Sequence, residues 1–337
     1  MTLRKTTAAL AGAAAILAVG MPAANAQVVM KMASATVNDV QHEFQKVFAE
    51  ELAARVGDAV TVEIYPASQL GAIPRMVEGV LFGTIESFIT PTSFLVGTDP
   101  RFAAFDTPGL FADGAHVGRV IHDPEYRRHL EGFAQGSGLR IIGVIYNSPI
   151  LVLSTTPIET LADFDGLKIR TFATPLQMEP MTSVGASPTP LALTEVIPAL
   201  QSGGIDGMLA GMPILTAFKY WDVAEYVTDL NFATVISVNV VNEAWFQSQP
   251  QEIRTAIREA GRAAEAQVLQ WGIDNVAAAN QLWLDNGGQI LTLPAEEQAQ
   301  MEADFAAIAE AFLHQDGAVW AEYESLRDMA AARREAE

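Results

Sequence analysis

The sequence contains no cysteine among its 337 residues. That absence excludes disulfide bonds, thiolate metal sites and cysteine nucleophiles, and we expect no lipid-modified cysteine to anchor the chain. Basic residues are scarce as well, because 20 Lys and Arg stand against 40 Asp and Glu, a formal net charge of −20. Such an acidic protein is a poor partner for nucleic acid and for anionic membranes. If its ligand is an anion, the attraction must be local.

Long apolar runs are also missing, apart from one short stretch near the N-terminus. There, Arg4 and Lys5 precede the apolar residues Ala8 to Val19, and Ala24-Asn25-Ala26 has the pattern of a cleavage site. The stretch is too short and too rich in alanine for a good membrane span. We therefore interpret residues 1–26 as a signal peptide rather than a helical anchor. Its removal takes the net charge from −20 to −22, and the mature chain is expected in the bacterial periplasm.

Catalytic signatures are the third absence. The sequence has no G-x-S-x-G, H-E-x-x-H, P-loop or G-x-G-x-x-G motif, so we expect no enzyme, no metal site and no cofactor. His122 and His129 are interpreted as part of a solvated helix surface. For His42 there are two interpretations, a pocket residue or an ordinary, partly exposed histidine. An exported hydrolase or lyase is the alternative from another functional class, and turnover of a bound ligand would reveal it.

Apolar periodicity predicts alternating strands and helices along the chain. A strand from Val28 is followed by a helix from Val40, which Gly57 closes, and by a strand over Val60 to Tyr65. This order is typical of a mainly parallel sheet with helices on its faces. The later predicted elements are strands over 83–90, 139–146, 150–154, 167–170, 205–209 and 235–241, helices over 76–82, 116–132, 176–185, 194–201 and 251–284, and a last helical region from Met301.

The length suits two domains of ordinary size. The break at Asn147-Ser-Pro149 indicates a crossover between them, and the strand over 235–241 is expected to return to the first sheet. We predict one lobe from residues 27–147 and 236–275, and a second lobe from residues 148–235 and 276–303. Residues 304–337 are expected to form a C-terminal helical segment.

One stretch, Asp165-Gly-Leu-Lys-Ile-Arg170, reads as a turn and a strand that ends in an arginine. Ligands of open α/β sheets lie at the ends of strands, and a guanidinium offers planar donors matched to a carboxylate. We therefore expect Arg170 to hold a small organic acid. The alternative role is a salt bridge to Asp163 or Asp165, but exposed ion pairs add little stability, which favours the ligand.

An ordered set of motifs along the chain resembles one family, the extracytoplasmic solute receptors of tripartite ATP-independent periplasmic (TRAP) transporters, of DctP type. The motifs are Tyr65-Pro-Ala-Ser-Gln-Leu-Gly71, Glu78 to Gly83-Thr-Ile-Glu86, Pro157-Ile, Asp165-Gly-Leu-Lys-Ile-Arg170, Val184-Gly-Ala, Glu195 to Ala199-Leu-Gln, Gly204-Ile-Asp-Gly207, Lys219 to Tyr226 and Asn242-Glu-Ala-Trp245. The resemblance covers essentially the whole mature chain.

The resemblance implies a two-lobed, periplasmic-binding-protein-like α/β fold (type II-like) with a long helix bridging both lobes. It also implies closure on an organic acid through an arginine at the position of Arg170, and delivery to the small and large TRAP membrane subunits. A receptor of an ATP-driven importer or of a sensor kinase is the alternative within the same broad class, and neighbouring genes would discriminate between them.

The sequence departs from the family pattern at two positions. Pro149 stands where many members carry a second arginine, and Asp206-Gly207 is followed by Met208-Leu-Ala210 instead of Gln-Glu-Asn. Both differences replace polar contacts by apolar surface, so we expect a monocarboxylate with an apolar or aromatic body. The full set of candidate ligand contacts is Arg170, Phe172, Asn147, Phe94, Thr92, Asn38, Arg75, Met208 and Met212. For the apolar members the alternative is core packing, and for Arg75 it is an exposed helix arginine.

Overall fold

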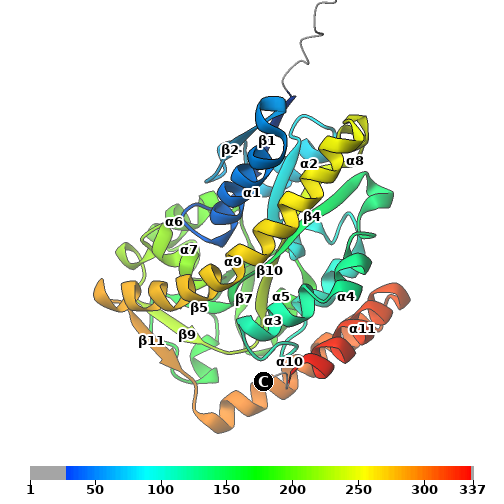
Figure 1. Cartoon of the computed structure of the whole chain (residues 1–337). Coiled ribbons are helices and arrows are strands. Elements are labelled where there is room, and N and C mark those ends of the chain that lie inside the picture. Colours follow the sequence, from blue (N-terminus) through cyan, green and yellow to red (C-terminus); the bar gives the residue numbers. More distant parts are fainter. Residues whose placement is uncertain (1–27, 335–337) are drawn as a thin grey trace, which may run out of the picture.

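The computed structural model describes residues 28–334 as an α/β protein with two sheets (Figure 1). The expected signal peptide, residues 1–26, lies outside the described residues. Helices cover both faces of each sheet, and apolar side chains fill the space between the layers. The two-lobed α/β class predicted from the sequence is confirmed. The residue boundaries of the two lobes stay a prediction.

The first sheet combines strands that precede most of the second lobe in the sequence with one strand that follows it. Its strands are β1 (Val28–Ser34), β2 (Val60–Tyr65), β3 (Ser87–Pro91), β4 (Leu139–Pro149) and β10 (Thr234–Asn242). Their order is β2-β1-β3-β10-β4, in which β1 pairs in parallel with β2 and β3 while β10 lies antiparallel between β3 and β4. The strand predicted to return to the first sheet therefore does so, between β3 and the edge strand β4.

Helix α1 (Val40–Val56) covers one face of this sheet, with Phe44 and Phe48 buried against it. It begins where it does because the carboxylate of Asp39 accepts a hydrogen bond from the backbone N–H of His42 at 3.1 Å, which caps the first turn. The opposite face packs against α2 (Ile73–Leu81), α3 (Gly114–Ile121) and α4 (Pro124–Leu130). Two 3₁₀ helices, η2 (Thr92–Leu95) and η3 (Pro100–Asp106), follow β3.

Two elements of the first lobe differ from the prediction. The single helix predicted over 116–132 is wrong, because α3 ends at Ile121 and Asp123 caps a new helix that starts with Pro124. Proline fits the first helical turn but not a helix interior. The third strand starts at Ser87 rather than Gly83, because Gly83 adopts φ +72° and the next two backbone N–H groups bond back to Gly79.

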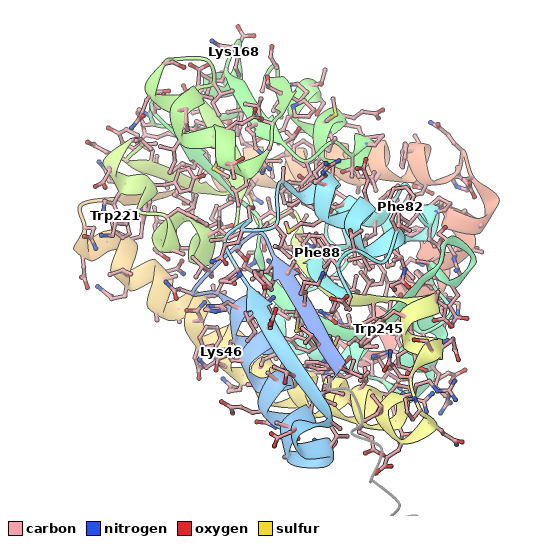
Figure 2. All side chains as sticks on the ribbon, turned by 90° about the horizontal axis from the view of Figure 1, so that it is seen from above. Lys46, Phe82, Phe88, Lys168, Trp221 and Trp245 are labelled. Carbon is pink, nitrogen blue, oxygen red and sulfur yellow. The ribbon has the colours of Figure 1, made fainter. Side chains whose placement is uncertain are left out.

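The second sheet has the order β11-β9-β5-β8-β6-β7. Its strands are β5 (Leu151–Ser154), β6 (Lys168–Thr171), β7 (Ser187–Pro190), β8 (Gly207–Ala210), β9 (Tyr226–Asp229) and β11 (Gln289–Thr292). The helices α5 (Pro175–Ser183) and α10 (Ala295–Leu313) lie on one face, and α6 (Leu193–Gln201) and α7 (Met212–Ala217) on the other. Figure 2 shows this lobe in green, with Lys168 at its outer edge, apart from the blue and cyan lobe that carries Lys46 and Phe82.

The long helix predicted over 251–284 is α9 (Gln251–Asp285), of 35 residues. It packs on α1 and β4 in the first lobe and on α7 and β11 in the second, so it bridges both (Figure 1). Its approach to β4 needs glycine, because a Cβ at Gly261 would lie 1.9 Å from the carbonyl oxygen of Ile142. Helix α8 (Glu243–Ser248) precedes α9, and α11 (Gly317–Arg333) ends the described chain against η3 and α3.

Two chain segments connect the lobes and lie side by side. One is the step from β4 to β5 at Ile150, and the other is the segment that joins β9 to β10. The backbone N–H of Ile150 donates to the carbonyl of Ala233 at 2.9 Å, and that of Gly109 donates to Phe232 at 2.8 Å. The facing ends of the two sheets are thereby held close, and the candidate site lies between them.

Candidate ligand-binding site

Arg170 lies on β6, next to the facing lobe. Ile169 points into the core of the second lobe, so its neighbour Arg170 points to the opposite face of the sheet. The strand pairs in parallel with β7 and β8, which places Arg170 between Thr189 and Met208. Arg170 is only 2% exposed, and its side chain is one of the largest that are fully buried in the protein.

The guanidinium of Arg170 has few partners among residues 28–334. Its Nε donates to the carbonyl oxygen of Leu191 at 3.0 Å, and its Cζ lies 5.1 Å from the ring centroid of Phe172. No carboxylate in this part of the chain lies within ion-pair distance of it, and its two terminal nitrogens make no hydrogen bond there. The alternative salt bridge is not found, since the carboxylate of Asp163 instead caps the short helix after Thr160.

Burial lowers the pKa of Arg170 to about 10, with the nearby Tyr220 acting weakly in the opposite direction. The guanidinium therefore keeps its charge at neutral pH. A buried charge without a counter-ion is unfavourable, and an anion placed on the free guanidinium nitrogens would remove that cost. Burial also raises the pKa of Tyr220 to about 12, so its hydroxyl stays neutral beside this charge.

A cavity of about 30 Å³ lies against Arg170, between the lobes. The volume exceeds the roughly 10–15 Å³ that a cavity needs to hold one water molecule. Residues of both lobes line it: Ala35, Thr36, Gln41, Ile73, Pro91 and Phe94 from the first lobe, Arg170, Phe172, Leu193, Met208, Ala210, Gly211 and Ile214 from the second, and Val235. The lining is mainly apolar, with Arg170, Thr36 and Gln41 as its polar members.

A second, larger cavity of about 300 Å³ adjoins the first. The two share Arg170, Phe94, Phe172, Ile73 and Leu193, so Arg170 borders both. The rings of Phe94 and Phe172 come from different lobes and meet with centroids 4.7 Å apart. Both rings line both cavities, so a ligand in either cavity would contact this aromatic pair.

Four of the predicted contact residues, Arg170, Phe172, Phe94 and Met208, line the inner cavity. Ala210, which stands where the family pattern has asparagine, lines it as well. These positions come together because they lie at or beside the facing ends of β3, β6 and β8. The structure therefore brings these four predicted residues together around one cavity, and their contact with a ligand stays a prediction.

Three other candidates are buried away from both cavities. The side chain of Asn147 lies within β4, where its Nδ2 donates to the hydroxyl of Ser237 at 3.1 Å. Thr92 is 1% exposed in η2, and Met212 packs in the core of the second lobe. Asn147 was expected in a loop, but β4 continues through Pro149, so its side chain is held in the sheet.

The remaining two candidates lie on the surface. Arg75 pairs with Glu78 at 3.7 Å, and its side chain is 78% exposed. Asn38 is exposed with φ +57°, and its backbone N–H donates to Nδ1 of His42 at 3.3 Å. Neither these residues nor His42 lines the two cavities. The interpretation of Arg75 as an exposed helix arginine fits its position.

Gln41 and Thr36 are cavity residues that sequence reasoning missed. Both belong to the turn that starts α1, where Thr36 donates to the capping carboxylate of Asp39 at 2.6 Å. A helix-capping pattern of Thr36, Asp39 and Gln41 is present in the sequence and would have placed these side chains at the end of β1. The amide of Gln41 is almost completely buried.

A polar contact also joins the lobes near the aromatic pair. The carboxylate of Asp106 in η3 accepts hydrogen bonds from the hydroxyls of Ser93 at 2.6 Å and of Thr174, in the second lobe, at 3.3 Å. Burial raises the pKa of Asp106 to about 6, although both hydroxyls act to lower it. The segment from Phe172 to Thr174 thus contacts the first lobe through a ring and through a hydroxyl.

Residues 28–334 contain no cluster of three or more His, Asp or Glu side chains placed to hold a metal ion. The histidines expected on a solvated helix surface have specific partners, since Nε2 of His129 lies 2.6 Å from Glu322 and that of His122 lies 3.2 Å from the carbonyl of Val144. None of the helices in that range combines the length and apolar character needed to cross a bilayer.

Comparison with known proteins gives a consistent result. The family model of the bacterial extracellular solute-binding proteins, family 7 (DctP), matches residues 32–316. The chain is 28% identical over 309 residues to the C4-dicarboxylate-binding periplasmic protein DctP of Rhodobacter capsulatus, covering 90% of this chain and 92% of that protein. It is also 28% identical over 227 residues to the 2,3-diketo-L-gulonate-binding periplasmic protein YiaO of Escherichia coli (strain K12), covering 67% and 69%.

Among solved structures, a TRAP periplasmic solute-binding protein from Desulfovibrio salexigens with bound orotic acid superposes with a TM-score of 0.84. The identity is 25%, and the match covers 90% of this chain and 99% of that one. These relatives are substrate-binding proteins of transporters and not enzymes. With the fold and the family match over most of its length, this chain belongs to the bacterial extracellular solute-binding proteins of family 7, the DctP family.

Proposed function

We propose that this protein is a periplasmic receptor that captures a small organic carboxylate on Arg170 and delivers it to TRAP membrane subunits. The observation that carries the proposal is the guanidinium of Arg170, which is 2% exposed and has no carboxylate partner among residues 28–334. A ligand carboxylate would accept two parallel hydrogen bonds from such a group. The same charge explains how an acidic protein attracts an anion, because the attraction acts inside the cleft.

The lining of the two cavities favours a monocarboxylate with an apolar or aromatic body. Among residues 28–334, Arg170 is the only basic residue that lines either cavity, and Phe94, Phe172, Leu193 and Met208 border the inner one with it; the polar side chains of Ser68, Thr171, Thr194 and Glu195 line the outer cavity. A second carboxylate or a row of hydroxyls would lose its hydrogen bonds to water against this surface. Relatives of this chain carry names that refer to a C4-dicarboxylate and to a diketo sugar acid. Family membership therefore supports a small organic acid as the ligand. The cavity lining supports the narrower class of monocarboxylates with an apolar or aromatic body.

Capture requires the lobes to separate and close again. Beside the inner cavity the lobes meet through the pair of Phe94 with Phe172 and through the hydrogen bond from Thr174 to Asp106. An apolar cluster also joins Ala103 of the first lobe to Leu176 of the second. These contacts would have to break on opening, whereas α9 packs on both lobes. The ligand would then select the closed state by adding contacts to both sides.

The membrane partners follow from the family. TRAP-type receptors work with a small and a large integral membrane protein, and we propose that the closed form of this protein docks on such subunits for ion-gradient-driven uptake. Residues 1–26, interpreted as a signal peptide, support a periplasmic location.

A thermal-shift screen tests the proposal. The protein is unfolded in denaturant and refolded to remove any bound ligand, and then melted with millimolar acids: apolar and aromatic monocarboxylates, dicarboxylates and sugar acids. Each acid is matched by its uncharged amide. A ligand that binds only the native state raises the melting temperature, so a shift is expected with monocarboxylates and not with their amides. The absence of a shift with every carboxylate would contradict a carboxylate receptor.

A further inference from the structure

Gln41 is the polar side chain of the first lobe that shares the inner cavity with Arg170 and lacks a full set of partners. It lies in the first turn of α1 and is 1% exposed. Its Oε1 is buried and accepts no hydrogen bond from any of residues 28–334. A buried acceptor without a donor is unfavourable, so its presence beside the cavity needs an explanation.

The neighbouring hydrogen bonds fix which end of the amide is free. The hydroxyl of Thr36 donates to Oδ2 of Asp39 at 2.6 Å, so its oxygen is left to accept. Nε2 of Gln41 donates to that hydroxyl oxygen at 3.1 Å and to Oδ2 of Asp39 at 3.4 Å. Rotating the amide by 180° would bring Oε1 against the carboxylate and remove both bonds. Oε1 of Gln41 is therefore the end of the amide that is left without a partner.

The hydrogen bonds around Asp39 agree with this orientation. Burial raises the pKa of Asp39 overall, and the hydrogen bonds from Thr36, from the backbone N–H of His42 and from Gln41 offset part of that rise. These three donors converge on the two carboxylate oxygens, as they would on an ionised group. Oδ2 of Asp39 thus acts as a hydrogen-bond acceptor. The NH₂ group of Gln41 can donate to it, whereas Oε1 of Gln41 cannot.

We propose that Oε1 of Gln41 determines ligand specificity by accepting a hydrogen bond from an O–H or N–H group of the bound acid. The inference rests on the proposed function, because Arg170 is taken to hold the carboxylate. Gln41 and Arg170 border one inner cavity of about 30 Å³, so the donor group should sit close to the carboxylate, on carbon 2 or 3. The preferred class is then a hydroxy acid, or an acid with an N–H at that position, whose remaining body is apolar.

A polar group built to pair with the ligand rejects analogues that lack the matching donor more strongly than an apolar wall rejects a missing methylene. For Gln41 the rejection comes from leaving Oε1 dehydrated and unpaired when an analogue without the donor binds. A difference of 1.4 kcal/mol corresponds to tenfold in affinity. We therefore expect the acid with the donor to bind at least about tenfold more tightly than its analogue.

The test is calorimetric titration of the refolded protein with matched pairs of acids: 2-hydroxybutanoate and 3-hydroxybutanoate against butanoate, and mandelate against phenylacetate. In the wild type, at least one hydroxy acid should bind tenfold more tightly than its partner. In Gln41→Met, which keeps the side-chain length and removes the acceptor, the ratio should fall below about threefold. Gln270→Met, the same change at an exposed position on α9, should leave the ratio as in the wild type.

The outcomes separate this inference from the proposed function. Equal affinities within every pair for the wild type would overturn the role of Gln41 while carboxylate binding stood, and this comparison needs no variant to fold. An unchanged ratio in Gln41→Met would overturn it as well. Failure of all these acids to bind at millimolar concentration would count against the proposed function itself, and the role of Gln41 would fall with it.

Discussion

Replacing Arg170 by methionine should make the ligand-free protein more stable. The side chain keeps its length but loses a buried charge that has no anionic partner among residues 28–334. A base whose pKa falls to about 10 on burial carries a penalty on the order of 3 kcal/mol in its charged form. Loss of the hydrogen bond to Leu191 costs roughly 1 kcal/mol. The net gain is about 2 kcal/mol, a rise in melting temperature of roughly 3 °C for a chain of this size.

The assay is thermal and urea unfolding at pH 7 of refolded protein, so that no carried-over ligand stabilises the wild type. Arg75→Met serves as the matched control, since the side chain of Arg75 is 78% exposed and its ion pair with Glu78 lies on the surface. Its effect should stay within about 0.5 kcal/mol. If Arg170→Met proves less stable than the wild type, the charge of Arg170 is already compensated in the free protein, and the reasoning behind the site is refuted.

Further predictions concern the lobe contact and α9. Burial raises the pKa of Asp106 to about 6, so its contribution favours folding at low pH and is lost as the pH rises from about 4 to about 6. The free energy of unfolding of Asp106→Asn should therefore rise by about 2–3 kcal/mol relative to that of the wild type when the pH is raised from 4 to 7. Urea unfolding at both pH values measures this, and a difference between the two proteins that is the same at both would contradict it. Gly261→Ala drives a Cβ against the carbonyl of Ile142 and should cost about 3 kcal/mol or more; Gly317→Ala, in open space, should be nearly neutral. Glu265→Gln removes the closer carboxylate partner of the buried Arg127 and leaves it the pair with Glu131 at 3.5 Å; it should cost about 3 kcal/mol, and a value near zero by the same assay would contradict this.

Much of the fold could be predicted from the sequence because apolar spacing is a local signal. The periodicity of α1 and α9 follows from which face of each helix is buried, and the strand that returns to the first sheet is marked by its β-rich composition. The break at Asp123 and Pro124 was missed as a helix boundary, although proline at a first helical position is the expected pattern.

The site was only partly predictable, for physical reasons that differ between residues. Arg170 could be found because a charged residue at the end of a buried strand needs a partner. Asn147 was misplaced because β4 continues through Pro149, and proline is tolerated there because β4 is an edge strand of its sheet. Gln41 looks like any polar residue of a first helical turn. Its free oxygen becomes evident only when Thr36 and Asp39 are seen to occupy the other end of its amide.

The account depends most on Arg170 as the single charged anchor for a carboxylate. Calorimetric titration of the best acid from the thermal-shift screen against the wild type, Arg170→Met and Arg75→Met measures this directly. We predict that Arg170→Met weakens binding at least about 100-fold, while Arg75→Met binds as the wild type does. Binding by Arg170→Met within threefold of the wild type would contradict the account.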